Sequence, residues 1–181
     1  MTRRDTSAKR GGKRTAQKAE HMGKRGMLVA LAFIFSYIEA LIPIPMPAPG
    51  MKLGLANLVT IVGLYTVGLK DTCIITLIRI LLAGFTFGNA FSMWYSFSGA
   101  VLSLGIMIGL KAVKWFSPMG VSAAGGVGHN IGQLLAAAVV VENAGVLYYL
   151  PILMAGGVIA GGAIGLLGGM VIRRTERLFR L

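Results

Sequence analysis

The stretch LYYLPILMAGGVIAGGAIGLLGGMVI, residues 147–172, is followed directly by RRTERLFRL, residues 173–181. The first part contains no Lys, Arg, Asp or Glu over 26 residues, which is long enough for a helix that crosses the hydrocarbon core of a bilayer. The second part holds four arginines, and basic residues are enriched on the cytoplasmic side of membrane helices. The stretch therefore predicts a membrane helix whose C-terminal end lies in the cytoplasm.

The rest of the chain has the same character. Of its 181 residues 55% are hydrophobic and 13% are charged, with a mean hydropathy of +0.74, which is too apolar for a soluble domain. Several predicted segments are shorter than the ~20 residues of a typical crossing helix, so tilt, a locally thinner bilayer or a re-entrant element must absorb the difference. The predicted fold class is an all-α membrane protein with six transmembrane helices, at 27–44, 55–69, 72–87, 94–112, 121–141 and 147–172.

The basic residues orient these helices. With six crossings, sixteen of the eighteen Lys and Arg residues lie on one side, and Glu142 lies on the other. Both termini are therefore predicted to be cytoplasmic in a multi-pass protein of the bacterial plasma membrane. We expect a disordered basic tail at 1–26, a transmembrane domain at 27–172 and a basic cytoplasmic tail at 173–181. The basic clusters contain no RNA- or DNA-binding motif, so the lipid bilayer, and not nucleic acid, is the expected partner.

Small residues recur every fourth position in three of the predicted helices. In a membrane such stripes let helix backbones approach closely. Most of them are expected to pack within the bundle, but the stripe on the first helix could instead dock the helix of a partner. The stripes are Gly157, Gly161, Gly165 and Gly169; Gly128, Gly132 and Ala136; and, on the first helix, Ala32, Ser36 and Ala40.

A few polar residues lie inside the apolar segments. Ionisable groups at membrane depth are costly and usually face a cavity or one another. The functional interpretation is a site open to the outside for a small polar or anionic ligand. The alternative is that Arg79 pairs with Glu39 while His129 and the amides cross-link helices. The predicted ligand-binding residues are Lys52, Asn57, Arg79, Asn89, His129, Asn130 and Gln133.

The segment PIPMPAPG, residues 43–50, is stiff because four of its eight residues are prolines. It could cover the outer mouth as a lid, with Glu39, Pro45, Pro47 and Pro49 forming a gate or ion pair, or it could be a rigid connector. No metal or cofactor is predicted. The chain has a single cysteine, Cys73, and His129 has no second ligand of metal-binding type near it in the sequence.

Three motifs carry a resemblance to a known family. They are KLGLAN at 52–57, GNAFS at 88–92 and GHNIGQ at 128–133. The body of the chain, about residues 27–172, resembles the Gx transporter family, whose members are often labelled heptaprenyl diphosphate synthase component I. More distantly it resembles the S components of energy-coupling-factor transporters. That resemblance implies a ligand pocket near the outer face and a first helix that docks a transmembrane coupling subunit.

The synthase label can be compared with the chemistry of the chain. Prenyl transfer needs two Asp-rich clusters that hold Mg²⁺ on a diphosphate, whereas the only aspartates here are Asp5 and Asp71. The chain is therefore predicted not to be an enzyme, and without a phosphate-binding loop any ATP-driven transport needs separate ATPase subunits.

Two hypotheses for the function of the chain remain. The chain is a substrate-binding transport subunit for a compound such as a vitamin, a flavin or an isoprenoid precursor. Alternatively, it is an accessory subunit for a soluble prenyltransferase or a flavin-linked extracellular electron-transfer system.

Overall fold

The computed structural model describes the backbone of residues 3–42 and 54–179 and shows an all-helical chain. Within these residues there are six α-helices and one short 3₁₀ segment, and no strand, so the predicted all-α class and helix number are confirmed. The elements are α1 (Arg3–Leu41), α2 (Asn57–Thr66), α3 (Leu69–Thr86), α4 (Ala90–Val113), α5 (Pro118–Val140), η1 (Ala144–Tyr149) and α6 (Leu150–Phe179).

Sequence signals set several helix ends. The side chain of Asn89 accepts a hydrogen bond from the backbone N–H of Ser92 at 2.8 Å, and the Ser92 hydroxyl accepts one from the N–H of Asn89, forming a capping box that starts α4. At α5, Ser117 is the N-cap and Pro118 the first helical residue, where a missing N–H costs nothing. The turn before α3 uses Gly68 at a positive φ of 94°, which glycine adopts without strain.

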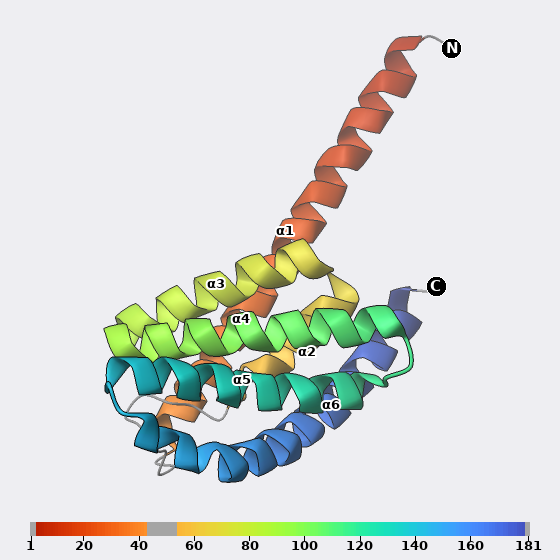
Figure 1. The fold of residues 1–181 in the computed structure, drawn as a ribbon. Helices are drawn as coiled ribbons and strands as arrows, with labels where there is room; N and C mark the ends of the chain where they lie inside the picture. The colour runs from red at the N-terminus through yellow and green to blue at the C-terminus, as the bar shows by residue number, and fades with distance from the viewer. Residues whose placement is uncertain (1–2, 43–53, 180–181) are drawn as a thin grey trace.

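The helices pack as one bundle in which α5 lies between α4 and α6 (Figure 1). The predicted glycine stripe of α6 makes the close contact with α5. A Cβ on Gly161 would lie 2.6 Å from the carbonyl oxygen of Ser122, and one on Gly165 would lie 2.6 Å from the Cα of Met119. These backbones touch only because both positions are glycine, so this stripe serves packing within the chain.

Three helical stretches are long and apolar enough to cross a membrane, namely Ala90–Val113, Pro118–Val140 and Ala144–Thr175. The other predicted crossings are less clear. Helix α2 has ten residues, or about 15 Å of rise against a hydrocarbon core of roughly 30 Å. Helix α3 is long enough but contains Lys70, Asp71 and Arg79. Many large apolar side chains on α1 and α3 are nevertheless exposed, for example Ile34, Leu77 and Phe85.

The basic N-terminal segment differs from its prediction. A disordered tail was expected over 1–26, but α1 begins at Arg3 and projects well beyond the bundle (Figure 1). Two physical causes support a helix here. The segment contains three Ala and nine Lys or Arg residues, which are good helix formers, and it extends a helix that is already nucleated by packing.

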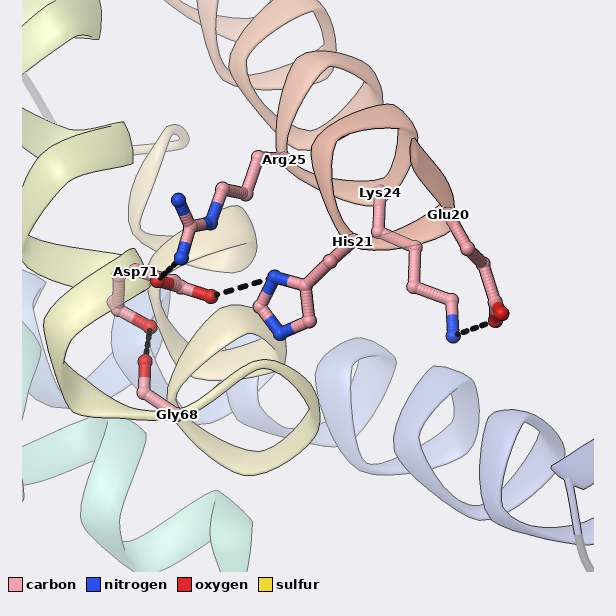
Figure 2. Close-up of polar contacts among 7 residues, drawn as sticks. Glu20, His21, Lys24, Arg25, Gly68 and Asp71 are labelled. Atoms are coloured by element: carbon pink, nitrogen blue, oxygen red, sulfur yellow. Dashed lines mark hydrogen bonds and ion pairs between the residues drawn. The ribbon is translucent and has the colours of Figure 1, made fainter. Parts of the chain in front are cut away.

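A buried acid fixes α1 to the start of α3 (Figure 2). Asp71 is 4% exposed and forms ion pairs with two α1 residues, the guanidinium of Arg25 and the Nδ1 atom of His21, the latter at 3.3 Å. Glu20 and Lys24, one turn apart on α1, form a separate exposed pair at 2.7 Å. Exposed pairs of this kind contribute little, whereas a carboxylate buried between an arginine and a histidine anchors the helix that carries them.

Candidate functional site

Four helices contribute the buried polar residues that form the candidate site. Each of them is less than a tenth exposed, and together they lie in the interior of the bundle. The residues are Ser36 and Glu39 on α1, Asn57 on α2, Arg79 on α3, and His129 and Gln133 on α5.

Glu39 holds the turn that leads into α2. Its Oε1 atom accepts hydrogen bonds from the backbone N–H groups of Gly54 and of Leu55, the second at 3.3 Å. Orphan N–H groups at the start of a helix are natural partners for a carboxylate. Because Glu39 lies in the last turn of α1, this contact closes the chain between the end of α1 and the start of α2.

The turn at Gly54 lies against α5. Gly54 has a positive φ of 93°, and a Cβ placed there would lie 2.8 Å from the Asn57 amide nitrogen and 3.4 Å from the His129 ring. On its other side, the ring of His129 packs on Gly99 of α4, where a Cβ would lie 2.9 Å from ring atoms. Two glycines thus provide the space for His129, and sequence reasoning did not identify either of them.

His129 and Gln133 share one face of α5, as their four-residue spacing predicts. The Gln133 amide nitrogen lies 2.7 Å from the Nε2 atom of His129. This contact between the two side chains holds the imidazole in one orientation.

Arg79 is held from α1. It is 4% exposed, and its Nη1 donates a hydrogen bond to the hydroxyl of Ser36 at 3.2 Å. Glu39, one turn further along α1, is the carboxylate that acts electrostatically on Arg79, although no ion pair within 4.0 Å joins the two among the described contacts. Glu39 thus links the Arg79 group to the turn at Gly54, and direct pairing of Arg79 with Glu39 is not what holds the guanidinium.

Other predicted residues lie elsewhere. Asn89 is exposed and its side-chain oxygen caps α4, so its observed contacts are structural. Asn130 donates from its amide to the carbonyl oxygen of Leu153 on α6 at 2.7 Å, which cross-links α5 and α6. Lys52, and the gate prolines Pro45, Pro47 and Pro49, lie outside the described residues.

The stripe expected to dock a partner is mostly internal. Ala32 is 1% exposed and Ser36 is fully buried, in contact with α3 through Arg79, whereas Ala40 is exposed. A partner helix on this side would meet Ala40 and the exposed Tyr37 and Leu41 instead. Sequence spacing identified a close-packed face of α1, but that face packs against this chain's own helices.

A groove of about 630 Å³ lies between α4 and α5, and none of these polar residues lines it. Its lining is apolar and includes Trp94, Phe97, Leu102, Leu135 and Val139. Trp94 and Phe97 stack with their ring centroids 6.5 Å apart. Such an open apolar surface fits lipid chains, and it contains none of the predicted ligand-binding residues.

Among the residues with described side chains, no three or more His, Cys, Asp or Glu side chains gather as a metal site would require.

A family model described as heptaprenyl diphosphate synthase component I matches residues 28–171. This match covers the bundle and leaves out most of the helical extension of α1. No curated protein and no solved structure matches the chain. The family indicated by the sequence motifs is confirmed, and the more distant resemblance to S components stays a prediction.

Proposed function

The chain belongs to the family described as heptaprenyl diphosphate synthase component I, and from that premise we propose that it is a non-catalytic membrane subunit that binds a small polar or anionic compound. It does so in the manner of the substrate-binding subunits of transporters. The compound enters from the outer side. Vitamins, flavins and isoprenoid precursors are suitable classes, and energy coupling comes from separate transmembrane and ATPase subunits.

The buried cation Arg79 is the observation that carries this proposal. Removing a guanidinium from water is expensive, and inside a membrane such groups usually mark a substrate or ion pathway. Among the described residues no carboxylate forms an ion pair with Arg79 within 4.0 Å, and the Oε1 atom of Glu39 bonds to backbone N–H groups of the turn before α2. His129 and Gln133 add an oriented polar face that a ligand could use. Lys52, Asn89 and Asn130 complete the proposed ligand set, with Pro45, Pro47 and Pro49 as its gate.

We also propose that all six helices lie at membrane depth and that both termini are cytoplasmic. Exposed apolar side chains on α1 and α3 support this, because a surface of that kind in water would aggregate. The charge distribution supports the orientation, since the N-terminal segment, Lys70, Lys111, Lys114 and the C-terminal arginines then share one side. Helix α2, which is short, crosses only part of the bilayer.

Trypsin treatment of oriented vesicles checks this topology. In inside-out vesicles we expect trypsin to remove the basic extension of α1, because Lys18 is exposed on it. In sealed right-side-out vesicles the extension should stay intact, as followed by an antibody to an N-terminal tag. Cleavage from the outside, without loss of vesicle integrity, would show that the orientation is reversed.

An accessory role in isoprenoid synthesis is the second candidate, and the description of the family favours it. Under this alternative the chain brings a soluble prenyltransferase, or a flavin-linked extracellular electron-transfer system, to the membrane. The chain itself lacks the Asp-rich clusters for the reaction. Its polar interior is then structural, and Arg79 matters for folding or assembly only.

Native mass spectrometry of the full chain, gently extracted from its own membrane, separates the two functions. We expect a retained small molecule that is lost in Arg79→Gln protein of unchanged helix content. Lys114→Gln is the matched control, because Lys114 is an exposed cation at the end of α4 and should leave retention unchanged. A stoichiometric soluble enzyme without any small molecule would support the accessory role. Folded wild-type protein that retains no small molecule would contradict the binding proposal.

A further inference from the structure

The guanidinium of Arg79 forms a hydrogen bond on one of its edges only, among the described residues. Its Nη1 donates to Ser36, whereas Nε and Nη2 have no hydrogen-bond partner among the described residues. Both atoms are buried from water, and the residue as a whole is 4% exposed. Buried donors are nearly always satisfied, so two adjacent unsatisfied N–H groups on a charged side chain call for an explanation.

The two atoms form one recognition element. The Nε–H and one Nη2–H of a guanidinium are coplanar and point in the same direction, as a fork that matches the two oxygens of a carboxylate or phosphate. The hydroxyl of Thr76 is also buried and without a hydrogen-bond partner among the described residues. Thr76 precedes Arg79 by three residues on α3, so the two side chains share a face of the helix.

We propose that Arg79 binds an oxyanion of the ligand, a carboxylate or a phosphate group, through two parallel hydrogen bonds from Nε and Nη2. Ser36 holds the opposite edge of the guanidinium and so fixes the direction of this fork. Thr76 supplies a third donor from the same helix. This inference rests on the proposed ligand-binding function and narrows it from polar or anionic compounds to those that carry an oxyanion with two oxygens to share.

Neighbouring contacts leave the fork available. Glu39 is the acid among the described residues that acts on Arg79, and its Oε1 is engaged by the N–H groups of Gly54 and Leu55. The negative charge of Glu39 partly offsets the positive charge of Arg79, but the Glu39 carboxylate does not accept hydrogen bonds from Nε and Nη2 of Arg79. A neutral amide of the same shape would satisfy one N–H of the fork and present a donor to the other. The loss of one hydrogen bond to a charged group accounts for about a ten- to hundred-fold difference in affinity.

The test observes the Arg79 side chain directly. Full-length protein labelled with ¹⁵N-arginine is placed in nanodiscs, and the Nε–H resonance of Arg79 is assigned by its absence in Arg79→Lys protein. Sodium acetate, sodium phosphate, acetamide and sodium chloride are then titrated at matched ionic strength. We expect acetate or phosphate to move this resonance saturably and acetamide and chloride to leave it in place. A response to one anion alone identifies carboxylate or phosphate as the group bound.

Equal shifts with acetamide, or no shift with either oxyanion, would overturn the inference. Substitutions add a second readout on the molecule retained in native mass spectrometry. Arg79→Lys keeps the charge and removes the fork, and should lower retention about ten- to hundred-fold. Ser36→Ala should lower it by only a few-fold. A neutral retained molecule, held equally by Arg79→Lys protein, would leave the proposed function standing and reject the oxyanion. If wild-type protein retains nothing, the proposed function fails, while the acetate titration still reports on the fork.

Discussion

Replacing Gly157 with alanine is expected to lower the unfolding temperature of the protein, while the same change at the neighbouring Gly156 should raise it or leave it unchanged. A Cβ on Gly157 would lie 2.8 Å from the Cα of Val127 and 2.9 Å from its backbone nitrogen. The helices α5 and α6 must then separate along their contact, because no flexible side chain can move aside. Overpacking of this kind costs about 1–3 kcal/mol.

Gly156 provides the matched control because it lies on the same turn of α6. A Cβ there has nothing within 4 Å, so alanine adds no contact and gains helix propensity of about 1 kcal/mol. The two substitutions are chemically identical and should have opposite signs in thermal unfolding in nanodiscs. Equal unfolding temperatures of the two variants would mean that the backbones of α5 and α6 are not in contact at Gly157 and Val127.

Replacing Gly54 with alanine is the second change with a large expected effect, on both stability and ligand retention. Gly54 has a φ of 93°, where an L-residue pays about 1–2 kcal/mol. The added Cβ would also lie 2.8 Å from the amide nitrogen of Asn57 and press toward His129. We expect the turn before α2 to shift, which displaces the N–H groups bound by Glu39 and disorders the candidate site.

Gly68→Ala separates the two contributions. Gly68 has nearly the same φ, 94°, but nothing lies within 4 Å of its Cβ position, so alanine there carries only the backbone cost. Both variants should lose thermal stability, and only Gly54→Ala should also lose the retained ligand. Equal retention in the two variants would show that the contact of Gly54 with Asn57 and His129 does not matter for binding.

Local signals in the sequence predicted much of the helical framework. The glycine repeat of α6 and the His129–Gln133 spacing specify their helix faces directly, and both are observed in contact as expected. The start of α4 was predicted four residues late, at 94, although the Asn89–Ser92 capping pair marks it in the sequence. Helix faces are local properties, and for that reason they could be read without a structure.

The partners of the buried polar groups were harder to predict because they depend on tertiary contacts. Arg79 bonds to Ser36 across 43 positions of sequence, and no periodicity indicates that pairing. The role of Asp71 was missed for a related reason. Its partners, Arg25 and His21, belong to the basic segment whose composition predicts disorder, so the sequence offers Asp71 no structured partner there. Asn130 faces α6 because adjacent residues on a helix point in different directions.

Helix α1 is attached to the rest of the molecule at three levels. Arg25 and His21 hold Asp71 at the start of α3, Ser36 holds Arg79 further along α3, and Glu39 holds the turn before α2. A helix is stiff over this length, so these attachments move together when α1 tilts or slides. Movement of the projecting N-terminal extension is therefore transmitted along α1 to all three attachments. A force applied to the extension would reach the guanidinium of Arg79 without passing through any loop.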